Sequence, residues 1–133
     1  MKPLETACAV RGAFAVIRLA GELDYSTVHL AETTVNRAFA GPTPHLIFDL
    51  SGLTLMDSSG VALLLQTYKT LRERHGTIAL AGPSPSIQRT ASITGVTKLM
   101  PVFATVDEAA SIAPVALPPS ASAAESESTD RSL

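Results

Sequence analysis

The segment from residue 45 to residue 65 constrains the fold of this chain more than any other. It opens with the apolar run His45-Leu46-Ile47-Phe48-Asp49-Leu50 and, after six intervening residues, continues with Asp57-Ser58-Ser59-Gly60. Apolar residues then recur at helical spacing. The short apolar run predicts a buried strand of a sheet covered by helices, and the later periodicity predicts an amphipathic helix. We therefore expect a central strand, a polar loop and a helix that begins near Ser58.

Asp57, Ser58 and Ser59 fall where this helix is predicted to begin. The first backbone N–H groups of a helix have no partner within it, and together with the helix dipole they favour an anion. Asp and Ser are preferred there because their side-chain oxygens accept hydrogen bonds from those N–H groups. A hydroxyl at this position can also carry a phosphate. The residues alone leave helix capping and phosphorylation as alternatives.

Strands and helices are expected to alternate along the rest of the chain. Strands are predicted over residues 7–10, 13–19, 45–50, 77–81 and 102–104, with a turn at Gly12 and a strand end at Gly21. Helices are predicted from Asp24 or Ser26 to about Ala40, from Ser58 to His75, from Ser84 to Gly95, and from Thr105 to about Ile112. This order predicts an α/β fold with a small mixed sheet of four to five strands and about four helices, mainly parallel in its later part.

Composition limits the organisation and the partners of the chain. Its 133 residues, 46% of them hydrophobic, suffice for one small domain, expected over residues 1–113. Residues 114–133 are rich in Ala, Ser and Pro and carry three acidic side chains, which predicts a disordered tail. A net charge of −2 gives no attraction to DNA or to an anionic membrane. Without an apolar run long enough to span a bilayer, we expect a cytoplasmic protein, most simply a monomer.

Two motifs stand out in the sequence: Leu19-Ala20-Gly21-Glu22-Leu23-Asp24-Tyr25-Ser26-Thr27, and Leu50-Ser51 followed by Leu55-Met56-Asp57-Ser58-Ser59-Gly60-Val61. Together they resemble the STAS family, specifically the bacterial anti-sigma factor antagonists. In that family a Gly-Glu-Leu-Asp strand leads to the first helix and an Asp-Ser-Ser/Thr-Gly loop leads to the second. The resemblance covers roughly residues 5–112 and implies the STAS fold.

The resemblance also implies a function and a phosphorylation site. It makes Ser58 the phosphorylated position, with Ser59 as the second candidate. A family member binds an anti-sigma factor that is also an ATP-dependent serine kinase, and this binding releases a sigma factor. Phosphorylation ends the binding, and a metal-dependent serine phosphatase restores it. The nucleotide and the metal belong to the partners, so we expect no cofactor and no metal site in this chain.

A partner-binding surface is expected next to Ser58. Helical spacing places Ser58, Ser59, Ala62, Leu63 and Gln66 on one strip of the helix, with Leu63 exposed. We add Asp57 and Gly60, which adjoin the serines, and the resemblance adds Asp24 and Thr27. The alternatives are that Leu63 is a scattered surface residue and that Asp24 and Thr27 only cap the first helix.

Enzymatic functions find little support in the sequence. The residues around Ser58 do not form a Gly-x-Ser-x-Gly turn, and neither the Walker pattern nor Gly-x-Gly-x-x-Gly occurs. The single cysteine, Cys8, and the isolated residues His29, His45 and His75 lack metal-ligand spacing. We therefore expect no catalysis by this chain.

Two other functions remain as alternatives. Asp49 ends a central strand, as the phosphorylated aspartate of a response-regulator receiver does, but the acidic cluster and the lysine of a receiver are missing. We interpret Asp49 as a carboxylate that orients a loop. The second alternative is a STAS scaffold subunit of a transporter or of a sensory complex, without a phosphorylation switch.

Overall fold

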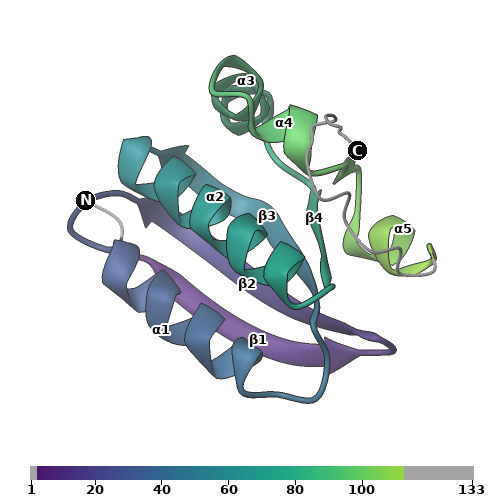
Figure 1. Ribbon diagram of the computed structural model, residues 1–133. Coiled ribbons are helices and arrows are strands. Elements are labelled where there is room, and N and C mark those ends of the chain that lie inside the picture. The colour runs from purple at the N-terminus through teal and green to yellow at the C-terminus, as the bar shows by residue number, and fades with distance from the viewer. Residues whose placement is uncertain (1–2, 113–133) are drawn as a thin grey trace, which may run out of the picture.

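One five-stranded mixed sheet forms the centre of the protein, with its strands in the order β1-β2-β3-β4-β5. The computed structural model describes residues 3–112 (Figure 1). The strands are β1 (Glu5–Arg11), β2 (Phe14–Leu23), β3 (His45–Met56), β4 (Thr77–Ala81) and β5 (Val102–Phe103). The helices are α1 (Val28–Phe39), α2 (Ser58–Glu73), α3 (Pro85–Ile93), α4 (Val96–Leu99) and α5 (Val106–Ala110).

The pairing of the strands confirms the predicted fold class. β1 and β2 are antiparallel and are joined at Gly12, whose positive φ of 58° suits a tight turn. β3, β4 and β5 then pair in parallel, each beside the strand before it. A parallel neighbour requires a crossover, and α1, α2 and α3 with α4 provide these connections. The carboxyl ends of β2 and β3 consequently lie side by side, and each of the two motifs runs through one of these ends.

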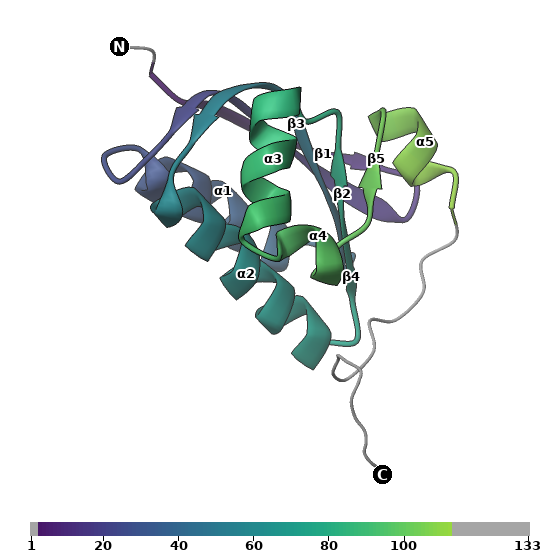
Figure 2. The same cartoon turned by 90° about the horizontal axis from the view of Figure 1, so that it is seen from above.

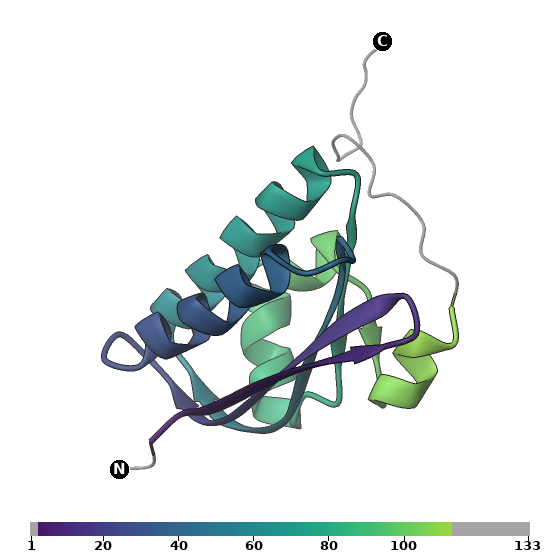
Figure 3. The ribbon, with the colours of Figure 1, turned by 90° about the horizontal axis from the view of Figure 1, so that it is seen from below.

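Helices cover both faces of the sheet unequally, as Figures 2 and 3 show. α1, α2, α3 and α4 pack on one face around the main core, whose largest buried side chains include Phe48, Leu64 and Leu80. α5 packs on the other face against a smaller cluster that contains Phe14 and Ile47. The alternation of Ile47 and Phe48 between the two clusters explains why β3 reads as a continuous apolar run rather than an alternating one.

β3 is longer than the sequence predicted, because the expected polar loop after Leu50 is part of the strand. Residues 52–56 continue to pair with β2 through two register irregularities. A Cβ atom at Gly52 would lie 2.9 Å from the Cβ of Ala20, so glycine allows the two strands to approach closely here. Only Asp57 separates β3 from α2.

β2 does not end at Gly21, so that prediction was also wrong. The strand continues to Leu23 with a register irregularity between Gly21 and Glu22. Gly21 has a φ of 109°, and a Cβ atom on it would lie only 2.3 Å from the carbonyl oxygen of Pro3. The glycine therefore allows a bend and a close backbone contact within the strand, and it does not end the strand.

Two helix boundaries differ from the prediction. α1 begins at Val28 with Thr27 at its N-cap, after a turn that starts at Asp24, so neither Asp24 nor Ser26 opens it. The helix that was predicted to run from Ser84 to Gly95 ends at Ile93, and Gly95, with a φ of 86°, is the N-cap of the short α4. The predicted tail and the domain boundary at residue 113 lie outside the described residues and stay predictions.

Candidate functional site

Asp57 is the residue that caps α2. Its Oδ1 accepts hydrogen bonds from the amide N–H groups of Ser59, at 2.8 Å, and Gly60, at 3.3 Å. Its backbone carbonyl accepts the N–H of Val61, and its own N–H donates to the carbonyl of Leu23. These bonds fix the start of α2 to the end of β2. The sequence left open which residue caps the helix, and the structure shows that it is Asp57. Ser58 is the first residue of the helix and is exposed.

The loop between β2 and α1 is organised by a second carboxylate. Oδ1 of Asp24 accepts hydrogen bonds from the hydroxyl of Ser26 (2.7 Å), the N–H of Ser26 (2.9 Å) and the N–H of Thr27 (3.1 Å). The Ser26 hydroxyl, followed by the other donors, lowers the pKa of Asp24, because each bond stabilises the ionised carboxylate. The buried Thr27 hydroxyl donates to the carbonyl of Glu22 and accepts from the N–H of Asp24. Thr27 occupies the N-cap position of α1, but its side chain makes no capping hydrogen bond, so the side chains of Asp24 and Thr27 fix the loop.

A hydrogen bond to the side chain of Asp57 also joins the two motifs. The N–H of Tyr25, in the loop after β2, donates to Oδ2 of Asp57 at 3.1 Å. Both oxygens of Asp57 are therefore engaged, one by α2 and the other by the β2–α1 loop. Tyr25 itself has 84% of its surface exposed. Sequence reasoning missed this residue, because neither its type nor its spacing indicates that its amide binds a carboxylate 32 positions away.

Gly60 has a packing role in the same corner. A Cβ atom on Gly60 would lie 2.7 Å from Cγ of Met56 and 2.9 Å from Cγ of Leu23. Both neighbours are buried. Glycine therefore lets the first turn of α2 approach the ends of β2 and β3.

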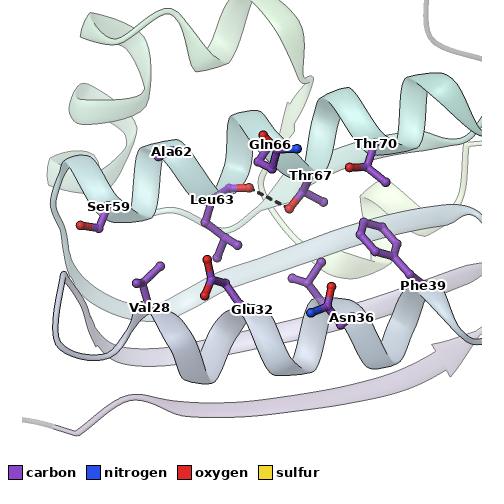
Figure 4. A pocket seen from close by; sticks show the side chains of 11 residues that line it. Val28, Glu32, Asn36, Phe39, Ser59, Ala62, Leu63, Gln66, Thr67 and Thr70 are labelled. Atoms are coloured by element: carbon purple, nitrogen blue, oxygen red, sulfur yellow. Dashed lines mark hydrogen bonds between the residues drawn. The ribbon is translucent and has the colours of Figure 1, made fainter.

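The predicted strip on α2 lies along a groove between α1 and α2 (Figure 4). The groove has a volume of about 720 Å³. Its lining consists of Val28, Glu32, Val35, Asn36 and Phe39 from α1, and Ser59, Ala62, Leu63, Gln66, Thr67 and Thr70 from α2. The sequence indicated only the α2 side, because the pairing of two helices is a tertiary feature that the periodicity of one helix does not reveal.

Leu63 is not exposed, contrary to the prediction. Only 7% of its surface is accessible, and it belongs to the main core. Figure 4 shows its side chain directed toward α1. Because α1 packs beside α2, a residue that faces away from the sheet can still be buried between the helices. Ala62 and Gln66 are exposed, and Ser59 is partly exposed.

Asp49 makes a local contact. Its Oδ1 accepts hydrogen bonds from the N–H and the hydroxyl of Ser51, at 3.1 and 2.7 Å. Ser51 lies within β3, so Asp49 orients a strand residue and not the loop that we expected. Within residues 3–112, no group of three or more His, Cys, Asp and Glu side chains is placed to hold a metal ion.

The histidines and Cys8 lie apart from this corner. His45 stands at the start of β3, where its Nδ1 is 3.1 Å from the hydroxyl of Thr77. His29 is exposed on α1, and His75 follows α2 with a φ of 59°. Cys8 is partly exposed on β1. Among residues 3–112, no hydrogen bond joins any of these four side chains to Asp24 or Asp57.

The sequence matches the STAS domain family over residues 6–109, so the chain belongs to that family. Its relatives include several anti-sigma factor antagonists. The anti-sigma F factor antagonist of Paenibacillus polymyxa is 30% identical over 89 residues, which are 66% of this chain and 76% of that protein. The resemblance to anti-sigma factor antagonists, which rested on the two motifs, is therefore confirmed.

Solved structures agree with this membership. An anti-sigma factor antagonist from Mycobacterium paratuberculosis has a TM-score of 0.75 and 27% identity, covering 81% of this chain and 92% of that one. The Bacillus cell fate determinant SpoIIAA in its phosphorylated form has a TM-score of 0.62 and 33% identity, covering 84% and 97% of the two chains. The chain thus belongs with the anti-sigma factor antagonists, which are regulatory binding proteins and not enzymes. No helix among residues 3–112 has the length and apolar character to cross a membrane.

Proposed function

We propose that this chain is a cytoplasmic antagonist of an anti-sigma factor and that phosphorylation of Ser58 controls it. In the unmodified form it binds the anti-sigma factor and thereby releases a sigma factor. The anti-sigma factor is also the serine kinase, which transfers the γ-phosphoryl group of ATP to Oγ of Ser58, takes up the hydroxyl proton and releases ADP. The phosphorylated form no longer binds. A metal-dependent phosphatase hydrolyses the phosphoserine and restores the binding form, and the antagonist itself acts as a monomer without a cofactor.

One observation carries the assignment of Ser58. Its side chain is exposed at the first position of α2, while the neighbouring Asp57 already supplies the cap of that helix. The hydroxyl is therefore accessible to a kinase, and its modification removes no hydrogen bond on which the helix depends. Ser59 is less accessible and begins the groove between α1 and α2. The relative SpoIIAA, for which a phosphorylated form has been solved, supports a switch of this kind.

The predicted partner-binding residues divide by exposure into two groups. Ala62 and Gln66 are exposed, and Asp24, Asp57 and Ser59 are partly exposed, so we propose that these five contact the partner. Thr27, Gly60 and Leu63 are buried, so we propose that they hold the contacting segments in place.

Electrostatics provides the reason that a phosphate would end the binding. A phosphate adds nearly two negative charges at neutral pH, directly beside the Asp57 carboxylate. A partner that binds the unmodified protein here would then have to remove water from the phosphate or place its own negative charge next to it. One such contact between like charges costs about 4 kcal/mol near a protein surface, which corresponds to roughly a thousandfold loss of affinity.

The proposal is tested in two steps. First, wild-type protein and Ser58→Asp are used to capture proteins from a lysate of the native organism, and the bound proteins are identified by mass spectrometry. We expect the wild type to retain an ATP-binding anti-sigma kinase that Ser58→Asp loses. If both forms retain the same transporter or scaffold subunits, the scaffold alternative replaces the switch.

The second step identifies the acceptor. The purified kinase and ATP should phosphorylate the wild type and Ser59→Ala equally, and Ser58→Ala should take up no phosphate. Ser59→Ala is the matched control, because it removes the adjacent hydroxyl on the same helical turn. Phosphate uptake by Ser58→Ala together with its loss in Ser59→Ala would move the site to Ser59.

A further inference from the structure

Two of the first amides of α2, those nearest to a phosphate on Ser58 along the helix, already have an acceptor. The N–H groups of Ser59 and Gly60 both donate to Oδ1 of Asp57. A phosphate on Ser58 would lie next to this carboxylate, and both anions would compete for the same two donors. The phosphate has the larger charge and three acceptor oxygens, which favours it in this competition.

Displacing the Asp57 carboxylate has a consequence beyond α2. Its other oxygen, Oδ2, accepts the N–H of Tyr25 at 3.1 Å. A carboxylate that turns away from the Ser59 and Gly60 amides also moves away from this N–H, because both oxygens belong to one rigid planar group.

We propose that Asp57 transmits the phosphorylation state of Ser58 to the β2–α1 loop and thereby sets the position of Tyr25 on the partner-binding surface. This inference rests on the proposed phosphorylation of Ser58. In the unmodified protein Asp57 holds the Tyr25 backbone, and the Tyr25 side chain is 84% exposed on the loop that Asp57 contacts. In the phosphorylated protein Tyr25 loses this restraint. Asp24 still binds Ser26 and Thr27, so the change is confined to the tip of the loop.

An exposed aromatic side chain suits a role in binding. Tyrosine is enriched among the residues that dominate interface energies, and its cost of immobilisation falls when the backbone is already held. Phosphorylation would then weaken partner binding in two ways, by charge at Ser58 and by release of Tyr25.

The test requires no partner. Phosphoserine is incorporated at position 58 by codon reassignment, and the solvent exchange rate of the Tyr25 amide proton is measured by NMR. We expect exchange to accelerate about tenfold, because a hydrogen bond to a charged acceptor is lost. The matched control carries phosphoserine at position 86, an exposed site in the first turn of α3 whose cap is the neutral Ser84, and it should leave Tyr25 unchanged.

A second variant tests the role of Asp57 without any phosphate. Asp57→Asn keeps one oxygen for the Ser59 and Gly60 amides, but its NH₂ group cannot accept the Tyr25 N–H. It should accelerate exchange at Tyr25 and leave the amides in the centre of α2 protected. The proposal is overturned if Tyr25 exchanges at the unmodified rate in either the phosphoserine-58 protein or Asp57→Asn. If Tyr25 exchanges faster as expected but the capture experiment finds no anti-sigma kinase, the result counts against the proposed function and not against this inference.

Discussion

Oδ2 of Asp57 lies 3.1 Å from the backbone nitrogen of Tyr25, although the two residues are 32 positions apart. This hydrogen bond joins the segments that follow two neighbouring parallel strands, and each segment contains one of the motifs found in the sequence. The helix that begins after Asp57 and the loop that contains Tyr25 thus form one corner of the molecule. Ser58 is exposed at this corner.

Replacing Asp57 with alanine should destabilise the fold. The Ser59 and Gly60 amides lose their acceptor at the start of α2, and the Tyr25 amide loses its acceptor as well. We expect Asp57→Ala to lower the free energy of unfolding by about 1–2 kcal/mol, as measured by urea denaturation. Ser58→Ala, at the adjacent exposed position, should change it by less than about 0.5 kcal/mol. Equal stabilities of the two variants would contradict the assignment of Asp57 as the cap.

Replacing Leu63 with alanine should also destabilise the fold, because Leu63 is only 7% exposed and packs in the core. We expect a loss of about 2–4 kcal/mol in the free energy of unfolding. Gln66→Ala, at an exposed position that also lines the groove, is the control and should cost little. A neutral Leu63→Ala would restore the original expectation that Leu63 faces solvent.

Gly60→Ala should lower stability although alanine is the better helix former. The helical preference for alanine contributes about 1 kcal/mol in its favour. Against it, the new methyl group would overlap the buried side chains of Met56 and Leu23. Overpacking of this kind costs about 1–3 kcal/mol, so we expect a net loss of roughly 1 kcal/mol and a lower Tm in a thermal scan. A higher Tm than that of the wild type would mean that this corner is loosely packed.

The carboxyl group of Asp24 should titrate below its ordinary range. The hydroxyl of Ser26 donates to it and is the largest cause of the lowered pKa. Because the pKa is lower in the folded state, ionised Asp24 stabilises the fold above a pH of about 4 and loses this effect as the pH falls through the folded value. In a carbon-detected NMR titration, Ser26→Ala should raise the pKa of Asp24, and Ser86→Ala on α3 should not. An unchanged pKa in Ser26→Ala would rule out the hydroxyl as the cause.

The sequence predicted those features of the fold that depend on local patterns. Ser84 caps α3 and Thr105 caps α5, as expected, and β4 covers residues 77–81 as expected. These elements have clear boundaries because a capping side chain or an apolar run marks each one. The two motifs also led to the correct family, which their order and separation identify better than either motif alone.

The features that the sequence did not predict depend on neighbours in space. We expected residues 52–56 to lie in a polar loop, but they pair with β2 and are part of a strand. Leu63 was expected to face solvent, but its side chain points toward α1 and belongs to the main core. Tyr25 has no recognisable pattern, and only the position of Asp57 reveals its role. The site thus combines a locally encoded helix start with contacts that exist only after β2 and β3 have paired.

The most direct test of the central claim compares two affinities for the captured anti-sigma kinase by titration calorimetry. One sample is the unmodified protein, and the other carries phosphoserine at position 58. We expect the modified form to bind about a thousandfold more weakly, as the electrostatic argument requires. Equal affinities would show that Ser58 does not switch the interaction.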